Sequence, residues 1–520
     1  MAAKLGLCGK PPVDDAGKAL SIRLFNFSSP NMKNFHWAWY GFHIGFFAWY
    51  SIAGLSSYIK KEFPLSDAEY AESVMLSVAS TIVMRFAFGP ICDKFGPRLS
   101  MSMILIFGSI PVALFYFVRG CVSCLYALRF AIGFLGATFV PCQFYTSQFF
   151  APSVVGAANA FSGGWGNAGA GVTIIVMPYL LHAFTSGGMA DSEALNYVFL
   201  IPAAATFLSG IAIYFLSDDC PQGAWKNRAL PGETSEQAAE RCRLRDEAAQ
   251  EGAEEAKEKV PFSQSPLAKS LYDVVKNANT ACLAFQYMAS FGVEMILNQF
   301  MVLYFLASFK DADGNPPIDP KIGGVLVGIL ALLNLFSRAT GGIISDYLNK
   351  YLSMSGRIMV HFCALILEGA FMLVFVAMPD IWSAYAVAIV FSFFAQAANG
   401  TCYSIVPSVS PYKGMISGLV GAGGNLGVIV FAVIFKAFGD NMRMAFQVIS
   451  LFCFAAAALC LVLRVNGQWI VPNAATREAV AAEKAKQAPA KKTSVALESQ
   501  QTMGQSAVVA GIEPEPAPVN

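Results

Sequence analysis

The chain has 520 residues, of which 13% are charged and 56% are hydrophobic, and its formal net charge is +1. Soluble proteins carry about 25% charged residues, so this composition excludes a soluble enzyme and a disordered protein. A net charge this close to zero also excludes a typical nucleic-acid-binding protein. The apolar runs are much longer than the alternating segments of about 10 residues found in transmembrane β-barrels. The composition therefore predicts a polytopic helical membrane protein.

Twelve apolar stretches reach the length of about 17–25 residues that an α-helix needs to cross a bilayer. In chain order they cover residues 35–59, 70–91, 98–118, 122–146, 155–183, 194–216, 279–308, 322–345, 355–377, 381–406, 414–438 and 444–465. We therefore expect an all-α membrane protein with twelve transmembrane helices, in two groups of six that span 35–216 and 279–465.

Three polar segments flank these groups. Residues 1–34 have no apolar stretch before a small-residue cleavage site, so they predict a cytosolic segment and not a signal peptide. Residues 217–278 carry a mixed-charge run and predict a solvated cytosolic linker. Residues 466–520, rich in Ala, Lys and Gln and then in Glu and Pro, predict a disordered cytosolic tail. The loop charges favour cytosolic termini only weakly.

The 12 cysteines are scattered, mostly inside apolar runs. We interpret them as small buried hydrophobic side chains and not as a disulfide framework. Cys121 and Cys124 form one C-x-x-C pair. Because it lacks a thioredoxin-like context, we interpret it as incidental.

An internal repeat relates the two groups of helices. The second and eighth spans both end in a pattern of Arg, Gly four residues later and Asp eight residues later, and all three positions are offset by 253 residues. The residues are Arg85, Gly89 and Asp93 in the first copy and Arg338, Gly342 and Asp346 in the second. Parallel repeats of this kind place a substrate site between the two halves, near the middle of the membrane.

A second pair of motifs supports the same repeat. The fifth span carries GGWGNAG and the eleventh carries GAGGNLG, which places Asn167 and Asn425 258 residues apart. GGWGNAG also matches the G-x-G-x-x-G pattern, but it lies inside an apolar span and not after a strand, so we reject a dinucleotide site.

With these motifs in place, the chain resembles the major facilitator superfamily over residues 35–465. The loop motif GPICDKFGPR and the pattern Arg129-x-x-x-Gly133-x-x-Gly136 carry this resemblance. The doubled Gly-Asn signature with one Arg in each half is similar to the nitrate/nitrite porter family. The long linker, the DDCPQG stretch and the tail resemble its plant and algal branch. The resemblance implies the major facilitator fold, with two six-helix bundles.

Arg85 and Arg338 are the first candidate substrate residues. A charge in mid-membrane costs about 2.5–3.5 kcal/mol on insertion scales and marks a functional site by default. Nitrate is flat and monovalent, and a flat guanidinium offers two parallel N–H donors to it. Two facing guanidiniums could sandwich one nitrate, whereas Lys would not reproduce the fork. The alternative is that each Arg pairs with an acid or with helix-end carbonyls.

Five further residues complete the predicted substrate site. The Asn167 and Asn425 amides could donate hydrogen bonds to the substrate. The alternative is that both residues serve only in helix packing. Tyr287 has a match in the resembled family and could donate its hydroxyl, or be an interfacial aromatic. Phe46 could provide an aromatic wall, or belong to the core. Asn334 lies one helical turn before Arg338 and could share its face.

Three residues are candidates for proton coupling. Glu294 lies seven residues after Tyr287 on the same helical face, about 10 Å along the axis, and a membrane-buried Glu can hold a proton. It could equally bond a neighbouring helix. His43 could titrate near neutral pH, although a lone His is more often structural. Arg129 belongs to a superfamily motif that the resemblance links with proton coupling.

Asp93, Arg98 and Asp346 are candidate gating residues. Asp93 and Arg98 fit the superfamily's cytoplasmic loop motif. Asp93 and Asp346 could cap or pair with adjacent helices and so latch the inner side closed. We expect these residues to act on conformation and not to contact the substrate.

The sequence therefore predicts a multi-pass plasma-membrane importer of nitrate, and of nitrite as a second substrate, by proton symport with alternating access. Exchange of nitrate for nitrite, a nitrate sensor and a carrier of another solute are the alternatives. We expect no cofactor, metal site, catalytic residue or nucleic-acid partner, because no redox centre, nucleotide loop or nucleophile motif is present. Protons and membrane lipid are expected partners. The resemblance to the plant and algal branch also implies a small accessory membrane protein as a candidate partner.

Overall fold

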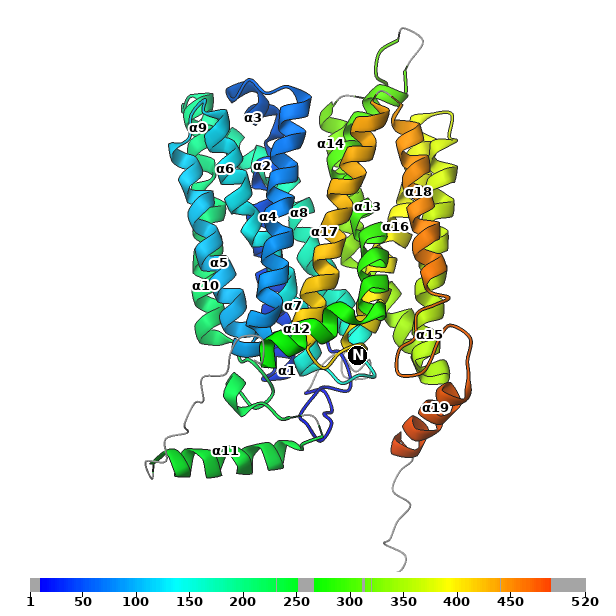
Figure 1. Cartoon of the computed structure of the whole chain (residues 1–520). Coiled ribbons are helices and arrows are strands. Elements are labelled where there is room, and N and C mark those ends of the chain that lie inside the picture. Colours follow the sequence, from blue (N-terminus) through cyan, green and yellow to red (C-terminus); the bar gives the residue numbers. More distant parts are fainter. Residues whose placement is uncertain are drawn as a thin grey trace, which may run out of the picture.

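The computed structural model describes residues 10–230, 232–250, 266–310, 314–318, 320–439 and 441–487. Within these ranges the chain is helical, with isolated β-bridges outside the helices. Figure 1 shows long, roughly parallel helices, with α11, α12 and α19 gathered at one end, which we call the linker end. The opposite end carries α3 and α9, and we call it the loop end.

The N-terminal half contains the elements up to residue 216. They are α1 (Asn31–Trp49), α2 (Ser51–Gly54), α3 (Ser56–Glu62), α4 (Asp67–Phe95), α5 (Pro97–Leu114), η1 (Phe115–Phe117), α6 (Val122–Ile132), η2 (Gly133–Thr138), α7 (Phe139–Phe149), α8 (Val155–Ser186), α9 (Asp191–Val198) and α10 (Leu200–Leu216). The linker holds η3 (Trp225–Asn227), α11 (Ser235–Gln250) and α12 (Pro266–Lys276).

The C-terminal half repeats this arrangement. It contains α13 (Ala278–Ser308), α14 (Pro320–Leu332), η5 (Leu333–Leu335), α15 (Ser337–Val376), α16 (Ile381–Ile405), η6 (Val406–Ser408), α17 (Lys413–Phe438) and α18 (Met442–Leu459). The long helix α15 is two helices in sequence, because Ser353 (φ 49°, ψ −141°) departs from helical geometry. The chain therefore changes direction at Ser353, between the eighth and ninth predicted spans.

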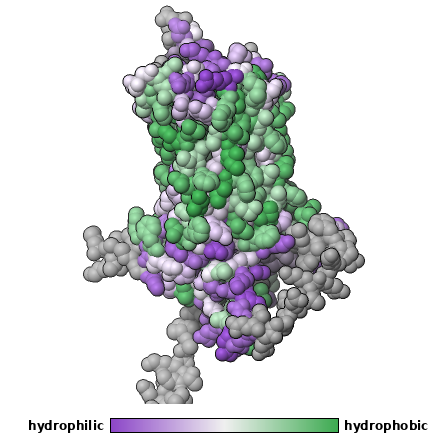
Figure 2. Space-filling view, turned by 90° about the vertical axis from the view of Figure 1, so that its left-hand side faces the viewer, coloured by the Kyte–Doolittle hydropathy of each residue, from purple (hydrophilic) through white to green (hydrophobic). Residues whose placement is uncertain are grey.

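On the face shown in Figure 2, a hydrophobic band covers the middle of the molecule and is flanked by polar surface at both ends. In the described part of the chain, 10 helical stretches are long and apolar enough to cross a membrane. One of them, Ile322–Val376, contains both the eighth and ninth predicted spans, and the first predicted span is not among them. The all-helical membrane fold is therefore confirmed, and the count of twelve stays a prediction.

The motif GPICDKFGPR forms the junction between α4 and α5. Helix α4 starts at a capping box, in which Ser66 and Glu69 satisfy each other's backbone N–H groups. It ends at Gly96, whose φ of 87° favours glycine, and Pro97 opens α5. A Cβ on Gly96 would lie 2.5 Å from Asp219 Oδ1, so a side chain is excluded there on steric grounds as well.

Glycines bring the two halves into close contact toward the linker end. Helix α4 packs against α17, and α8 packs against α15. A Cβ on Gly418 of α17 would lie 2.4 Å from the Arg85 carbonyl oxygen, and a Cβ on Gly342 of α15 would lie 2.5 Å from Ala160 Cβ. Small residues let helix backbones approach this closely in membranes. The two halves therefore meet through the helices that the repeat identified.

The segment after residue 465 differs from the predicted disordered tail. Ala474–Gln487 forms α19, and the hydroxyls of Thr476 and Ser355 are 2.7 Å apart in a buried hydrogen bond. The helix forms because this stretch is rich in Ala, Glu and Lys, which are strong helix formers. Residues 488–520 lie outside the described residues.

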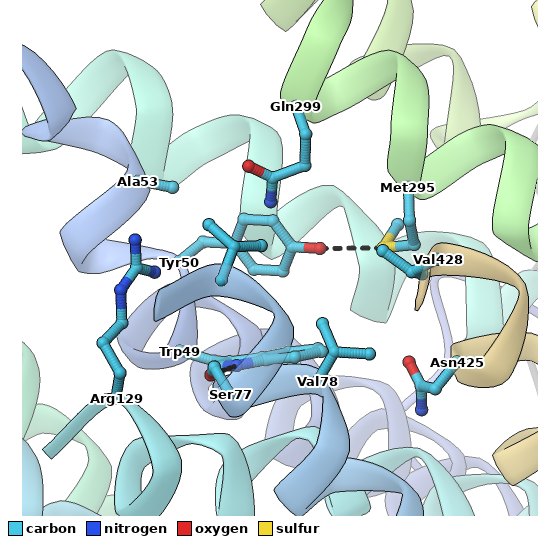
Figure 3. A pocket seen from close by; sticks show the side chains of 11 residues that line it. Trp49, Tyr50, Ala53, Ser77, Val78, Arg129, Met295, Gln299, Asn425 and Val428 are labelled. Atoms are coloured by element: carbon cyan, nitrogen blue, oxygen red, sulfur yellow. Dashed lines mark hydrogen bonds between the residues drawn. The ribbon is translucent and has the colours of Figure 1, made fainter. Parts of the chain in front are cut away.

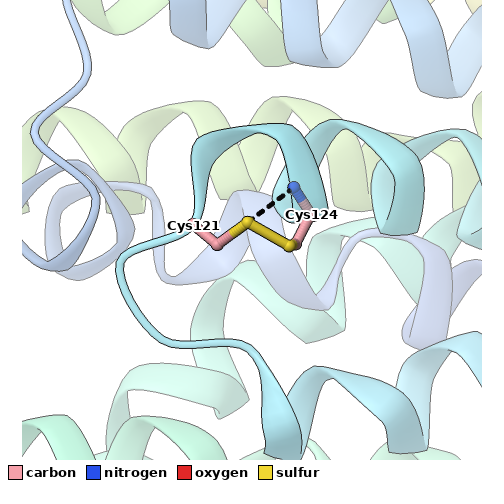
Figure 4. Close-up of a disulfide and its surroundings, with 2 residues drawn as sticks. All are labelled: Cys121 and Cys124. Carbon is pink, nitrogen blue, oxygen red and sulfur yellow. Dashed lines mark hydrogen bonds between the residues drawn. A yellow bond between two sulfur atoms is a disulfide. The ribbon is translucent and has the colours of Figure 1, made fainter.

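The C-x-x-C pair is not incidental. Cys121 and Cys124 form a disulfide at the start of α6 (Figure 4). The other cysteines of the described chain are free, and most of them are buried, as predicted. The interpretation was wrong for this pair because the motif stands at a helix N-terminus, where residues three apart in sequence come close together.

We predict that Gly418→Ala destabilises the protein by about 1–3 kcal/mol, because the added methyl overlaps the Arg85 carbonyl oxygen. The matched control is Gly324→Ala in α14, where a Cβ meets no atom within 4 Å. Thermal unfolding of the purified variants in detergent checks this. A Gly418→Ala protein as stable as the control would contradict the close packing of α4 on α17.

Candidate functional site

Two arginines from opposite halves lie against the same aromatic ring. Arg85 of α4 and Arg338 of α15 are buried, with 0% and 2% of their surface exposed. Their guanidinium carbons lie 4.8 and 6.0 Å from the ring centre of Phe139, the first residue of α7. The structure therefore brings the predicted pair together, with Phe139 as a shared neighbour that the sequence did not single out.

Arg85 forms hydrogen bonds with two backbone carbonyl groups and one side-chain amide. Its Nε donates to the Gly136 carbonyl and its Nη1 donates to the Gly421 carbonyl, both at 2.9 Å. With the Asn425 amide turned so that Oδ1 faces the guanidinium, this oxygen accepts from Nε and Nη1, both at 3.1 Å. The predicted Asn425 therefore lies at the site, where it orients Arg85.

Arg338 has fewer partners. Its Nη2 donates to the Tyr287 hydroxyl at 2.9 Å. None of the ion pairs in the described part of the chain involves Arg338 or Arg85. Arg85 Nη2 and Arg338 Nε and Nη1 are buried and have no hydrogen-bond partner among the described residues. A buried unsatisfied donor costs about 1–3 kcal/mol, and more when it is charged, so this group of N–H donors is suited to an anion.

Aromatic side chains enclose the two arginines. Tyr287 stacks on Phe291 with ring centres 5.1 Å apart and lies 5.9 Å from Phe139. Tyr403 packs edge-on against Phe139 at 4.8 Å. The predicted Phe46 lies behind Phe42, which itself contacts Phe139. The sequence identified Tyr287 and missed Phe139, Phe291 and Tyr403, because 43 Phe in one chain give no periodic signal that separates a wall from the core.

The glycine-rich motifs make room for the arginines. Gly163 of α8 and Gly421 of α17 hold equivalent positions in the two motifs. A Cβ on Gly163 would lie 3.2 Å from Arg338 Nη1, and a Cβ on Gly421 would lie 3.4 Å from Arg85 Cδ. Each glycine-rich helix therefore passes the arginine of the opposite half.

Glu294 of α13 lies inside a ring of asparagine amides. Its Oε1 accepts from Asn167 Nδ2 at 3.2 Å and from Asn334 Nδ2 at 2.7 Å, and its Oε2 accepts from Asn399 Nδ2 at 2.6 Å. Asn399 Oδ1 in turn accepts from Ser290 Oγ at 2.7 Å. Asn167 and Asn334 were predicted to contact the substrate; in this structure their amide nitrogens donate to Glu294. Asn399, in the middle of an apolar span, was missed.

The other two coupling candidates lie elsewhere. His43 Nδ1 hydrogen-bonds the Trp165 carbonyl oxygen at 2.9 Å, and its ring packs on Trp39. Arg129 of α6 has its guanidinium carbon 5.1 Å from the Tyr70 ring centre. It lines a small pocket between the two halves. The pocket is lined by Trp49, Tyr50, Ala53, Val74, Ser77, Val78, Arg129, Met295, Gln299, Asn425 and Val428 (Figure 3).

Two carboxylates connect the halves at the linker end. Asp93, in the last turn of α4, accepts from the backbone N–H groups of Gly414 at 3.0 Å and Met415 at 2.8 Å, at the start of α17. Asp346 of α15 accepts from Ala157 N at 2.6 Å, at the start of α8. A carboxylate at a helix N-terminus is favoured by the helix dipole. Each half therefore caps a helix of the other.

The two carboxylates differ in their charged partners. Asp346 forms a buried ion pair with Arg357 at 2.7 Å. Arg357 also donates to the carbonyls of Ser404 at 2.6 Å and Pro152 at 2.8 Å. The third predicted gating residue, Arg98, pairs with Asp219 at 3.2 Å, and both belong to the N-terminal side of the linker. Arg98 therefore stabilises the α4–α5 junction and makes no bridge between the halves through this pair.

Comparison with known proteins gives a consistent picture. A sequence model described as the Major Facilitator Superfamily matches residues 38–432. High affinity nitrate transporter 2.5 of Arabidopsis thaliana is 30% identical over 427 residues, which cover 82% of this chain and 78% of the relative. Nitrate transporter 2.1 of Chlamydomonas reinhardtii is 31% identical over 431 residues, which cover 82% and 72%.

More distant proteins are also similar to this chain. Nitrate/nitrite transporter NrtP of Picosynechococcus is 25% identical over 471 residues, which cover 77% of this chain and 84% of the relative. Among solved structures, the proton:xylose symporter XylE superposes with a TM-score of 0.61 at 13% identity, over 87% of this chain and 100% of that chain. A likeness at this identity concerns the architecture alone.

We predict that Asp346→Asn lowers stability by about 3 kcal/mol, because it leaves the buried Arg357 charge without its carboxylate. Asp93→Asn is the matched control, since the Asp93 carboxylate accepts two backbone hydrogen bonds; we expect it to lose about 1 kcal/mol. Thermal midpoints in detergent compare the two. Equal losses would show that the ion pair adds nothing to the capping contact.

Proposed function

Because the chain belongs to the Major Facilitator Superfamily, in the branch that contains the plant and algal high-affinity nitrate transporters, we propose that it carries nitrate across a membrane by alternating access. The family resemblance drawn from the sequence motifs is thereby confirmed. The protein is a membrane transporter and not an enzyme. Nitrite is the second substrate we propose, since cyanobacterial relatives are named nitrate/nitrite transporters.

One observation carries this proposal. Three donor nitrogens of Arg85 and Arg338 are buried without a partner among the described residues, on two guanidiniums beside one aromatic ring. Nitrate is planar, and each of its oxygens accepts hydrogen bonds in that plane, which matches the planar guanidinium fork. The aromatic surroundings favour a weakly hydrated anion over a strongly hydrated one. A sugar carrier would instead need several neutral polar groups and no arginine pair.

Asp93 and Asp346 each cap the N-terminus of a helix in the other half, and these two contacts define the conformational state that we propose for this structure. Asp93 and Asp346 join the halves at the linker end, while the pocket beside Arg129 lies between α1, α4 and α6 of one half and α13 and α17 of the other. We assign the structure to a state closed at the linker end. Opening that end requires both caps to break together, since each half contributes one carboxylate and one helix N-terminus.

The orientation follows from chemistry at the two ends. The Cys121–Cys124 disulfide stands at the start of α6, toward the loop end (Figure 1). Disulfides persist in oxidising compartments and are rare in the cytosol. We therefore propose that the loop end faces outward, that the linker and both termini are cytosolic, and that the protein resides in the plasma membrane.

For coupling, we propose that Glu294 carries a proton. As a carboxylate it accepts three amide N–H bonds. Once protonated, it must donate one hydrogen bond instead. Asn167 Oδ1 and Asn334 Oδ1 are buried without a partner in the described chain, so either amide can turn and accept a hydrogen bond from the protonated Glu294 carboxyl group. Because Asn167 belongs to α8 of the N-terminal half, this turn changes a contact between the halves.

Isotope-labelled nitrate uptake into proteoliposomes tests the function. We compare vesicles under an inward proton gradient with nitrite-loaded vesicles that have no gradient. Uptake driven by the gradient supports symport, and uptake only into loaded vesicles supports exchange. A nitrate sensor would bind nitrate and show no counterflow. The absence of both binding and uptake would overturn the proposed substrate.

We predict that Arg85→Lys and Arg338→Lys each weaken nitrate binding by roughly a hundredfold, as expected for the loss of one or two charge-assisted hydrogen bonds. Arg98→Lys is the matched control, because Arg98 pairs with Asp219 away from the site. Titration calorimetry measures binding and thermal unfolding reports folding. Normal binding by either site variant would rule out the two-arginine site.

We predict that Glu294→Gln removes the proton dependence of uptake but keeps nitrate exchange, because Gln is neutral at every pH. Glu368→Gln is the control, since Glu368 is also a fully buried carboxyl group of the C-terminal half. Initial uptake rates at several external pH values separate the two variants. Unchanged proton-driven uptake by Glu294→Gln would clear Glu294 of this role.

A further inference from the structure

The pocket beside Arg129 shares only Asn425 with the site at Arg85 and Arg338, and the chemistry of its other polar groups points to a ligand of its own. We propose that this pocket is an outer subsite for a monovalent oxyanion, which occupies it before moving to Arg85 and Arg338. The proposal rests on the proposed function and assigns to Arg129 a substrate role in place of the predicted coupling role.

Arg129 is a buried cation whose hydrogen-bonding capacity is largely unused. Only 4% of its surface is exposed, and its Nε and Nη2 have no hydrogen-bond partner among the described residues. The ion pairs of the described chain do not include it. The Tyr70 ring supplies one cation–π contact, which leaves the N–H donors unsatisfied. A buried cation in this condition is suited to an anion, because an anion would satisfy both its charge and its free donors.

The remaining lining of the pocket also suits an anion. The 11 lining residues include no Asp or Glu. Two of the polar groups are already engaged, since Trp49 Nε1 donates to Ser77 Oγ at 2.7 Å and the Tyr50 hydroxyl donates to Met295 Sδ at 2.7 Å. The Gln299 amide is a further polar group, and Figure 3 shows it above Tyr50, with Arg129 beside Tyr50. Arg129 and Gln299 are therefore the groups that would hold the ion.

The pocket borders a direct partner of Arg85, the first arginine of the central site. Asn425 lines the pocket, and the same amide oxygen accepts from Arg85 Nε and Nη1 at 3.1 Å. Arg129 lies on α6, which enters from the loop end (Figure 1). Under the proposal, an anion that enters from that end meets Arg129 first, then Asn425 and Arg85. Cations in series along a low-dielectric path raise the local concentration of an anion and its rate of arrival.

The pocket also lies where the two halves separate. It is bounded by α1, α4 and α6 on one side and by α13 and α17 on the other. In this state α4 and α17 touch closely at Gly89 and Gly414, where a Cβ on Gly89 would lie 2.9 Å from Met415 Cα, whereas Val78 and Val428 of the same helices line the pocket. The subsite would therefore be formed when the linker end is closed and would change shape as the halves move.

The test uses Arg129→Gln and Arg129→Lys in the full chain, reconstituted in proteoliposomes. We expect Arg129→Gln to raise the KM for nitrate about tenfold, with the maximal rate and the proton-to-nitrate ratio unchanged, because steering by a nearby charge is worth tenfold or more in arrival rate. Arg129→Lys keeps the charge and should retain most of the wild-type KM. Arg119→Gln, an exposed arginine at the loop end, controls for the loss of one surface charge.

The outcomes separate this proposal from its alternatives. An unchanged KM in Arg129→Gln overturns the subsite, as does an altered proton-to-nitrate ratio, which would return Arg129 to coupling. Identical defects in the Lys and Gln variants, with a lowered thermal midpoint, would mean that Arg129 only packs. If the wild-type protein transports no nitrate, the proposed function fails; if it does and Arg129→Gln matches it, only the subsite fails.

Discussion

Two guanidinium groups buried beside one phenylalanine ring, with no carboxylate paired to either in the described chain, set the main physical constraint on this protein. Burying a charge inside a membrane protein is costly unless something satisfies it. Arg85 is held by two backbone carbonyls and the Asn425 oxygen, and Arg338 by the Tyr287 hydroxyl. The donors that remain are available to a small anion, and much of the surrounding structure supports this arrangement.

The glycine-rich helices are the first consequence of that constraint. A side chain as long as arginine fits between two helices only if the facing helix presents almost no side chain. Gly163 faces Arg338 and Gly421 faces Arg85, so each half supplies the gap for the cation of the other half. The caps of Asp93 on α17 and Asp346 on α8 repeat this exchange at the linker end. Binding site and closure thus use the same two pairs of helices.

The repeat is broken at its asparagines, and this break is where coupling can enter. Asn425 faces Arg85, whereas its equivalent, Asn167, donates to Glu294 and not to Arg338. One half therefore holds an arginine oriented by an amide, and the other holds a carboxyl group inside a ring of amides. If Asn167 oriented Arg338 as Asn425 orients Arg85, the two halves would still bind an anion. They would then have no titratable group at the contact between them.

Hydropathy, the repeated Arg-Gly-Asp spacing and the Gly-Asn motifs determined the membrane fold, the family and the two central arginines, because length, charge and spacing are properties of the chain itself. Phe139 and Asn399 were beyond such signals, since an aromatic or an amide inside an apolar span acquires a role only from its neighbours. The partners of Asn167 and Asn334 were likewise decided by packing. Hydrogen bonds between helices depend on how those helices cross, and the crossing is set by the glycines and caps that join two halves far apart in sequence.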